Sequence, residues 1–345
     1  MAREASQPTV SAAVMTSLMF THFQPSVERM TVSIVRHSSV AQVRPMSPRV
    51  SNGTSNRSPL APVGQTKRNP AVWLVAALLS SGAVVALGLA LAVYAFFIEP
   101  YHLEVTHLKL PIRGLKARSC PIRIVHFADV HSDPTVRLEE ELPRRIAEQK
   151  PDIILYTGDT LNSVDAVPIC RDMFAKIRPI APLFCVKGDW DLEPDLALPV
   201  GVAGVQFLNG YKVLNIRGSE LCIIGNDCFV SQRQLVDSTR KAIPAKMPAI
   251  LITHQPDNDV VMSGKTAGVD LLLCGHTHGG QVALPFFGPI VTHSRLGTLY
   301  AVGLNRLNDM WIYTNRGIGM EGRLPRVRFC APPELTVIDL VPASN

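Results

Sequence analysis

Short apolar runs that end in polar residues recur along the chain from about residue 103 to the C-terminus. Examples are Ile-Ile-Leu-Tyr-Thr at 153–157 and Leu-Leu-Leu-Cys at 271–274. Runs of this kind are typical of strands in an α/β sheet. The pattern predicts strands near 103–110, 122–128, 153–157, 183–187, 221–225, 249–253, 270–274, 280–284, 298–302, 311–315 and 335–340.

Helical patterns lie between some of these runs, at about 138–149, 165–178 and 231–243. Pro143 and Pro168 suit the first turns of the first two helices. Strand–helix alternation is therefore followed by a strand-rich half. This order predicts an α/β fold in which two sheets pack together and the helices lie outside.

Five of the apolar runs are followed directly by residues that can bind metal ions. Because strands of this kind end at a common edge of a sheet, these side chains are expected to converge in space. A Gly precedes three of the polar positions and lets the chain turn sharply there. The motifs are Asp-Val-His at 129–131, Gly-Asp at 158–159, Gly-Asp-Trp-Asp at 188–191, Thr-His at 253–254 and Gly-His-Thr-His at 275–278.

The residue types in these motifs predict a centre for two metal ions. Carboxylate oxygens and imidazole nitrogens suit Mn, Fe, Zn and similar divalent ions. Two ions about 3.5–4 Å apart can share a hydroxide, aim it at phosphorus and neutralise the developing charge. The predicted sets share Asp159 as a bridge: Asp129, His131, Asp159 and His278 for one ion, and Asp159, Asp189, His254 and His276 for the other. A metal-free relic of the same fold is the alternative.

The order of these motifs resembles that of the calcineurin-like metallophosphoesterases, over about residues 120–340. Three longer segments are similar to a branch of small, membrane-associated members, which includes phosphodiesterases and relatives of UDP-2,3-diacylglucosamine hydrolases. They are 275–285, 315–319 and 332–336. The resemblance implies two packed mixed sheets flanked by helices, in a four-layer sandwich, and a dinuclear phosphoesterase.

One position departs from the family pattern. Gly-Asn-His-Asp in the family appears here as Gly188-Asp189-Trp190-Asp191. Asp189 keeps an oxygen ligand, whereas Trp190 replaces a His that usually stabilises or protonates the leaving oxygen. An indole N–H can donate a hydrogen bond but cannot deliver a proton. General acid catalysis is worth about 10²–10⁴ in rate. Either the leaving group needs no acid, another residue such as His293 supplies it, or turnover is slow.

Several other polar residues have two interpretations. Arg316 either binds phosphate with its planar guanidinium or forms a structural salt bridge. His126 is expected in the core, and Asp133 and Asp191 are expected to orient the ligands. Asn162 and Asn226 are expected to be turn residues rather than substrate contacts. Arg323, Arg326 and Arg328 are expected to form a solvated basic face rather than a substrate-binding face.

All of the net charge of +6 comes from the N-terminal tail. Residues 1–70 carry eight Lys or Arg and two acids, whereas 71–345 carry twenty-six of each sign. The domain therefore has no overall basic field, and no nucleic-acid partner is expected. The tail is rich in Ser, Thr, Pro and Arg without a helical or strand period, which predicts disorder. A mitochondrial-type presequence is the competing interpretation, but a clear amphipathic face is missing.

A single transmembrane anchor is predicted at 71–98, because these twenty-eight residues lack any charge and about 20 suffice to span a bilayer. Tyr94, Phe96 and Phe97 are expected near one interface. The side of the membrane on which the domain lies stays open. Lys67 and Arg68 favour an N-terminus inside, whereas an odd number of cysteines, several in apolar runs, points to buried thiols rather than disulfides.

These observations divide the chain into a basic tail (1–70), an anchor (71–98) and a metallophosphoesterase domain (99–345). The function expected first is a membrane-anchored phosphohydrolase that uses two divalent ions (Mn, Fe or Zn). Its substrate would be a phosphodiester or pyrophosphate, and the anchor makes a lipid-linked phosphate attractive. The alternative is a metal-binding or scaffold protein of the same fold with weak or lost catalysis, because Trp190 replaces the usual His.

Overall fold

In the computed structural model, the first described residue is Pro70, at the start of the expected anchor. The predicted tail lies outside the described residues, apart from Pro70, and side chains are described from Ser80. The described ranges are 70–116, 121–193, 196, 207–227, 236–237, 239–241, 243–244, 246–321 and 326–343.

Two mixed β-sheets form the centre of the domain, as predicted. In the first sheet the order is β1-β13-β2-β3-β4, with only the β13–β2 pair antiparallel. In the second it is β11-β12-β8-β7-β6-β5, with antiparallel pairs only at the two edges. The strands are β1 (Glu104–Ile112), β2 (Ile122–Phe127), β3 (Ile153–Tyr156), β4 (Leu183–Cys185), β5 (Gly210–Ile216), β6 (Ser219–Asn226), β7 (Ala249–Thr253), β8 (Leu271–Cys274), β11 (Gly303–Leu307), β12 (Met310–Thr314) and β13 (Glu334–Pro342).

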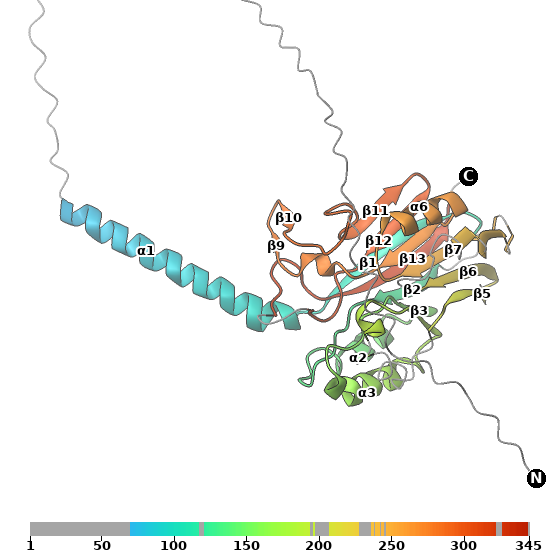
Figure 1. Cartoon of the computed structure of the whole chain (residues 1–345), viewed down its shortest axis with the longest axis horizontal. Helices are drawn as coiled ribbons and strands as arrows, with labels where there is room; N and C mark the ends of the chain where they lie inside the picture. Colours follow the sequence, from blue (N-terminus) through green and yellow to red (C-terminus); the bar gives the residue numbers. More distant parts are fainter. Residues whose placement is uncertain are drawn as a thin grey trace, which may run out of the picture. The chain divides into compact units, whose positions relative to one another are not determined.

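Alternate side chains of the buried strands enter different cores, which defines four layers. Ile153 and Leu155 of β3 pack in the core between the two sheets, whereas Ile154 and Tyr156 pack toward α2 (Leu142–Glu148) and α3 (Val167–Ile177). In β7, Ile250 and Ile252 also enter the central core, whereas Leu251 faces α6 (Asn258–Ala267). Helices therefore cover the outer face of each sheet (Figure 1). Strands buried on both faces read as continuous apolar runs, which is why the sequence revealed them.

The two edge strands of the second sheet were not predicted correctly. The run at 298–302 forms turns, and the strand β11 begins only at Gly303. The strand β5 (Gly210–Ile216) was not predicted. Both strands pair on one side only and contain only half-buried and exposed residues, so neither has a long apolar run. The run at 280–284 contains the short strand β9 (Ala283–Leu284), which forms a hairpin with β10 (Gly288–Pro289).

The helices α2 and α3 confirm the first two predicted helices within a few residues. Most of the third, at 231–243, lies outside the described residues. The helix α6 was missed, because only Val260 and Val261 of its four buried residues are apolar side chains of any size. It ends at Gly268, which adopts the left-handed conformation (φ 72°) that glycine tolerates best.

A long apolar helix precedes the domain. The helix α1 spans Pro70–Val93, and a π-helical turn (Tyr94–Ile98) and a 3₁₀ turn (Glu99–Tyr101) continue it. Within the described side chains, 80–101 are long and apolar enough to cross a membrane, with a mean hydropathy of 2.2. Contacts with the domain begin before residue 99, since the carbonyl of Ala95 accepts the N–H of Arg328 (3.1 Å). The buried carboxylate of Glu99 accepts the N–H groups of Cys330 and Ala331.

Arg328 lies in the interior, so its prediction as part of a solvated basic face is wrong. The guanidinium is fully buried and donates to the carbonyl oxygens of Gly319, Ala331, Gly317 and Arg316. Burial lowers the pKa of Arg328 to about 9, which still leaves it charged at neutral pH. Through these hydrogen bonds, Arg328 connects the segment 316–319 to the segment 328–331.

Arg326 is bonded to the carboxylate of Asp133, and Arg323 lies outside the described residues. His126 is a buried core residue as predicted, with its Nε2 bonded to the hydroxyl of Thr157 (3.0 Å). Burial lowers the pKa of His126 to about 3. Cys185, Cys222 and Cys274 are buried free thiols, in agreement with the sequence.

Replacement of the Arg328 guanidinium tests its structural role. We expect Arg328→Met to lower the free energy of unfolding by about 3 kcal/mol, because buried carbonyl oxygens lose their donors. Thermal unfolding of the full chain in detergent, followed by tryptophan fluorescence, measures this change. Arg144→Met is the matched control, because the Arg144 side chain is 62% exposed and its surface ion pairs contribute about 0–1 kcal/mol. Equal effects of the two substitutions would contradict the assignment.

Candidate metal centre

The seven predicted metal ligands follow the carboxyl ends of five parallel strands, drawn from both sheets. Strands β2, β3 and β4 run parallel in the first sheet, and β7 and β8 run parallel in the second. The chain leaves each strand directly into a motif, so both sheets contribute side chains to one place. The ligands follow the strands in this order: Asp129 and His131 after β2, Asp159 after β3, Asp189 after β4, His254 after β7, and His276 and His278 after β8.

Four of these residues form one compact group. The ligand atoms of Asp159, Asp189, His254 and His276 all lie within 4.8 Å of one another. His254 Nε2 lies 2.9 Å from Asp189 Oδ1 and 3.1 Å from His276 Nδ1. Two carboxylates and two imidazoles at this separation can enclose a single divalent ion.

A second group lies on the other side of Asp159. It contains His131, His278 and Glu321, whose ligand atoms also lie within 4.8 Å of one another. Asp159 Oδ2 lies 3.4 Å from His131 Nε2 and 3.2 Å from His254 Nε2. One carboxylate oxygen therefore lies between the two groups, where a bridging ligand would be.

Glu321 was missed from the sequence. It follows no apolar run and belongs to none of the five motifs, so strand-end reasoning could not reveal it. Asp129, by contrast, was predicted as a ligand but belongs to neither compact group among the described residues. Its buried carboxylate accepts the backbone N–H of His276 at 3.0 and 3.1 Å, and Asp129 Oδ1 lies 3.6 Å from His254 Nδ1. Its role as a ligand stays a prediction.

The unsatisfied polar atoms of the site fit a metal ion. His131 Nε2, His278 Nε2, Asp159 Oδ2 and Asp189 Oδ1 are buried and have no hydrogen-bond partner. Buried polar atoms without partners are costly, and native proteins rarely keep several together. A divalent cation would satisfy all four. The mixed oxygen and nitrogen set is of the kind that Mn, Fe and Zn bind.

The charges of the site favour a cation in the same way. Although burial lowers the pKa of His254, the carboxylates of Asp159, Asp189 and Asp129 raise it well above the usual value. Burial raises the pKa of Asp189, but the nearby imidazoles of His254 and His276 lower it overall. The carboxylates therefore stabilise positive charge between them, whether a proton or a metal ion carries it.

The backbone at these positions is unusual. Asp129, His131, Asp159, His276 and His278 all adopt positive φ angles, between 42° and 69°. Non-glycine residues seldom do so, and clusters of such residues occur at functional sites. The motifs after β2, β3 and β8 thus turn sharply as their strands end, which aims these side chains back into the site.

Neighbouring polar groups hold the imidazoles in one orientation. The Thr157 carbonyl can only accept, so His254 donates its Nδ1–H to it (2.8 Å) and presents Nε2 to the site. Asn162 Oδ1 lies 2.9 Å from His131 Nδ1 and orients that ring similarly. The Asn162 amide also donates to the carbonyls of His131 and Met320. Asn162 was interpreted as a turn residue, whereas the structure gives it this positioning role.

Asp191 organises the two turns from which Asp159 and Asp189 project, as predicted. Its buried carboxylate accepts the N–H groups of Asp159 (2.9 Å), Thr160 (2.8 Å) and Gly188 (3.0 Å). Gly188 cannot be larger, because a Cβ there would lie 1.9 Å from Asp159 Oδ1. Asp133 is ion-paired with Arg137 and Arg326.

Trp190 packs beside the second group of ligands. Its ring meets the His131 ring edge to face, with centroids 5.3 Å apart, and its backbone N–H donates to Asp159 Oδ1 (3.1 Å). Trp190 and Asn162 also line a hollow, together with Ser163, Val164, Glu193 and Leu196. The hollow therefore reaches residues that hold the site.

The two remaining predicted site residues, His293 and Arg316, do not belong to either group of ligands. His293 is exposed, and its Nε2 lies 3.7 Å from Glu321 Oε1, so it borders the second group. Arg316 Nη2 lies 2.6 Å from Glu104 and 3.4 Å from Glu334. These contacts are those of the salt-bridge interpretation of Arg316, and its phosphate-binding role stays a prediction.

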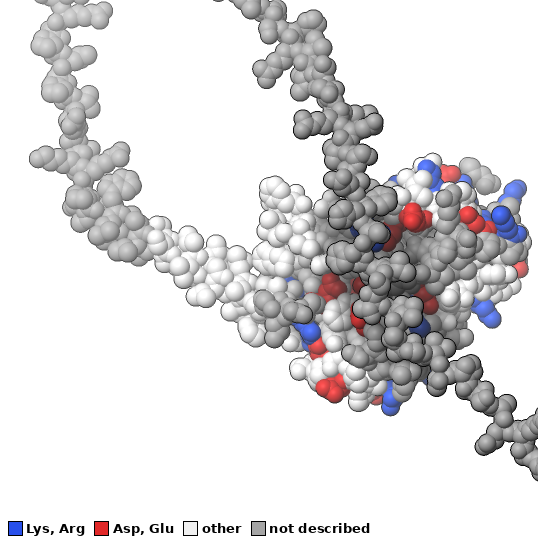
Figure 2. All heavy atoms as spheres, viewed as in Figure 1, with Lys and Arg blue, Asp and Glu red and all other residues white. Residues whose placement is uncertain are grey.

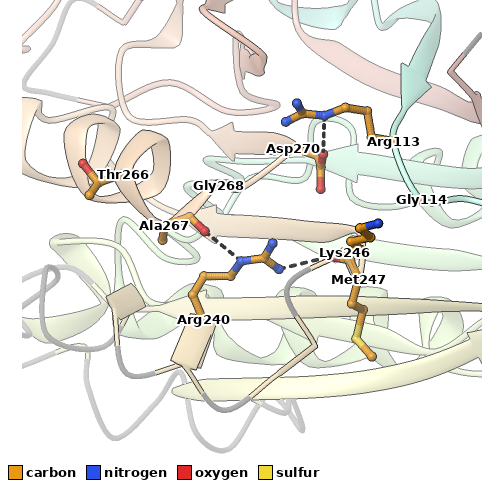
Figure 3. A pocket seen from close by; sticks show the side chains of 9 residues that line it. All are labelled: Arg113, Gly114, Arg240, Lys246, Met247, Thr266, Ala267, Gly268 and Asp270. Carbon is orange, nitrogen blue, oxygen red and sulfur yellow. Dashed lines mark hydrogen bonds and ion pairs between the residues drawn. The ribbon is translucent and has the colours of Figure 1, made fainter. Parts of the chain in front are cut away.

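A larger hollow on the second sheet does not include any of these residues (Figure 3). Two of its cationic side chains, Arg240 and Arg113, contact groups of the protein itself. Arg240 donates to the carbonyls of Ala267 and Met247, and Arg113 Nε lies 3.8 Å from Asp270 Oδ1. These contacts tie the end of α6 to its neighbours, which is a structural role.

The fold and site define a metal-dependent phosphoesterase, and comparison with known proteins agrees. Residues 122–280 match the model of the calcineurin-like phosphoesterases. The chain belongs to this family, since it is 32% identical to the uncharacterized metallophosphoesterase YkuE of Bacillus subtilis. That match covers 72% of this chain and 88% of YkuE. The predicted family and its four-layer fold are thus confirmed.

Two further relatives carry named activities. The phosphodiesterase YaeI of Escherichia coli is 29% identical, over 72% of this chain and 92% of YaeI. The UDP-2,3-diacylglucosamine pyrophosphatase LpxG of Chlamydia trachomatis is 25% identical, over 71% of this chain and 92% of LpxG. The chain is therefore similar to both a phosphodiesterase and a pyrophosphatase.

The central position of Asp159 leads to a test of the site. Asp159→Asn removes the negative charge of the oxygen between the two groups, so we expect the protein to lose both ions. Turnover should fall more than about 100-fold, since even the outer partners of metal ligands are worth 10–100-fold. Elemental analysis of the purified full chain and its phosphodiesterase rate measure these effects.

Asp172→Asn is the matched control, because the Asp172 side chain is 59% exposed on α3 and pairs only with Lys176 among the described contacts. It should keep the metal content and rate of the wild type. An Asp159→Asn protein with two ions per chain and near-normal turnover would remove Asp159 from the centre of the site.

Proposed function

We propose that this protein is a membrane-anchored phosphohydrolase that uses two divalent metal ions to cleave a phosphodiester or a pyrophosphate. The observation that carries the proposal is the position of Asp159 Oδ2 between two groups of ligand atoms, several of which lack partners. Two ions that share a ligand can stabilise both the attacking and the leaving oxygen in phosphoryl transfer.

The residues that would hold the ions fall into two sets that share Asp159. One ion would be held by Asp159, Asp189, His254 and His276. The other would be held by His131, His278 and Asp159, with Asp129 and Glu321 as further candidates. When bound, the two ions would neutralise charge on the phosphoryl group and supply an activated water.

The protein's own residues would then position and protonate the reacting groups. Asp191 and Asn162 hold Asp159 and His131 in place through the hydrogen bonds described above. Trp190 can donate its indole N–H to a substrate oxygen but cannot protonate a leaving group. His293 is exposed next to Glu321 and is the candidate for that proton transfer.

The substrate class is supported by the relatives and by the anchor. Similarity to YaeI and LpxG favours a phosphodiester or pyrophosphate. LpxG is named for a substrate that carries acyl chains, and α1 would hold the site near a bilayer, so a lipid-linked phosphate is the favoured substrate. The equal numbers of acidic and basic residues in 71–345 disfavour a nucleic acid.

A second candidate function rests on Trp190. A metal-binding or scaffold protein with lost catalysis would also keep the ligands but would not need the family's His. Bound metal without turnover on any phosphodiester or pyrophosphate would favour this alternative.

The two functions are separated by aryl phosphodiesters whose leaving groups differ in pKa. We expect the full chain, purified in detergent and loaded with Mn²⁺, Fe²⁺ or Zn²⁺, to hydrolyse them. If no acid is present, the rate should rise steeply as the leaving-group pKa falls, and Trp190→His should rescue the poorer substrates. If His293 is the acid, His293→Ala should slow those poorer substrates by about 10²-fold or more and leave metal content unchanged.

His107→Ala is the matched control, because His107 is an exposed histidine on β1. It should behave as wild type on every ester. If chemistry limits the rate and the rates of both wild type and His293→Ala are independent of leaving-group pKa, two hypotheses are excluded: that the general acid is missing, and that His293 is the general acid. No hydrolysis by a metal-loaded chain would contradict the proposed function.

The anchor is proposed from the composition and exposure of α1. Val84, Val85, Leu87, Leu89 and Val93 are exposed by 51–69%, and the most apolar window of 80–101 is 6% buried in the protein. An apolar helix with so little cover is stable in a lipid environment and not in water.

We therefore expect the full chain to stay with membranes after a wash in concentrated salt, which screens charged attachment but not a buried helix. Leu87→Arg combined with Leu91→Arg should release it, since each central Arg costs about 2.5–3.5 kcal/mol in a membrane helix. Ultracentrifugation and immunoblotting measure the partition. Release of the wild type by salt alone would show that α1 does not span the bilayer.

A further inference from the structure

A strongly apolar hairpin projects from the domain directly after the ligand-bearing loop. It consists of β9, β10 and the turn between them. Phe286 and Phe287 at its tip are 105% and 85% exposed, and Leu284, Ile290 and Val291 are each about half exposed. A run of exposed apolar side chains of this size is unusual for a soluble surface and marks a site of interaction.

The composition of the hairpin favours lipid as the partner. Residues 279–292 contain no Asp, Glu, Lys, Arg or His, so no ion pair can contribute to a contact there. Phe, Leu and Trp side chains are typical of the apolar faces that proteins bury at the membrane interface. In Figure 2 the projection at the position of β9 and β10 shows no charged residue on the visible face.

Backbone hydrogen bonds and a ring contact connect this hairpin to the domain end of the apolar helix. Phe329 accepts the N–H of Ala283 and donates to the carbonyl of Gln281, both at 2.8 Å, and so extends the base of the hairpin. The Phe329 ring packs edge to face on Tyr94, with centroids 6.4 Å apart. One residue away, Arg328 donates to Ala95, as described above.

We propose that the β9–β10 hairpin inserts Phe286 and Phe287 into the surface of the bilayer that holds α1. This proposal rests on the proposed anchor. The segment 328–331 is bonded to the hairpin and to the chain at 94–99, so both apolar elements leave the domain from one connected region. A second copy of this chain could also cover the phenylalanines, but a hairpin tied to the end of a membrane helix has lipid within reach.

The insertion would have a consequence for the site. The hairpin follows His278 by only a few residues, and Gly280 lies against it, since a Cβ there would be 2.6 Å from Pro289 Cβ. A hairpin fixed in the bilayer surface would therefore hold the loop that carries His276 and His278 at that surface. Substrates whose phosphate lies at the headgroup level would reach the site without leaving the membrane.

Photocrosslinking tests the proposal on the full chain. The photoreactive amino acid p-benzoylphenylalanine replaces Phe286, Phe97 or Tyr211 in turn, and each protein is reconstituted into phosphatidylcholine–phosphatidylglycerol vesicles with a radiolabelled acyl chain. Phe97 is 71% exposed at the end of the apolar segment and reports on the anchor. Tyr211 is an aromatic residue, 44% exposed on the edge strand β5, and is the matched control.

We expect position 286 to yield lipid adducts at a level similar to position 97 and several-fold above position 211. Adducts at 97 with only the control level at 286 would overturn the hairpin proposal and leave the anchor standing. Adducts at 286 alone would show that the hairpin meets lipid but would contradict the anchor, and with it the proposal that both enter one bilayer. Control levels at both positions would overturn both. A crosslinked dimer at 286 in place of a lipid adduct would show that a second copy covers the hairpin, which also overturns the proposal.

Discussion

Three carboxylates, those of the buried Asp129 and Asp159 and the half-buried Asp189, converge on His254 beyond the carboxyl ends of strands from both sheets. Carboxylates this close repel one another unless positive charge lies between them. The imidazoles of the site supply part of that charge only if they carry protons. A divalent ion supplies it without them, and this need for a cation links the fold to its chemistry.

Much of the surrounding structure serves to hold these charges in place. Asp191 collects three backbone N–H groups from the two turns that carry Asp159 and Asp189. Gly158 and Gly188 let those turns touch, since a Cβ on Gly158 would lie 2.4 Å from the Gly188 nitrogen. Backbone strain at the strand ends is therefore offset by hydrogen bonds and by the packing of two sheets. A rigid site of this kind loses little free energy in organising itself when ions and substrate bind.

The sequence predicted those parts of the molecule whose signal is local. A buried strand and the motif after it are neighbours in the chain, so the ligands after the central strands could be found. Glu321 reaches the site from a segment with no such signal, and Asn162, although it follows Asp159 by three residues, is brought to His131 only by tertiary structure. Arg328 was predicted to be exposed because its partners are backbone carbonyls, which no sequence pattern reveals. Edge strands such as β5 were missed for a related reason: much of their surface faces solvent, so their sequence has no long apolar run.

The central claim is that two ions share Asp159. Anomalous diffraction from crystals of the wild-type chain, collected at the absorption edges of Mn, Fe and Zn, tests it most directly. The account predicts two peaks about 3.5–4 Å apart on either side of Asp159 Oδ2, one against His254 and His276 and the other against His131 and His278. A single peak, or two peaks that do not share Asp159, would contradict it.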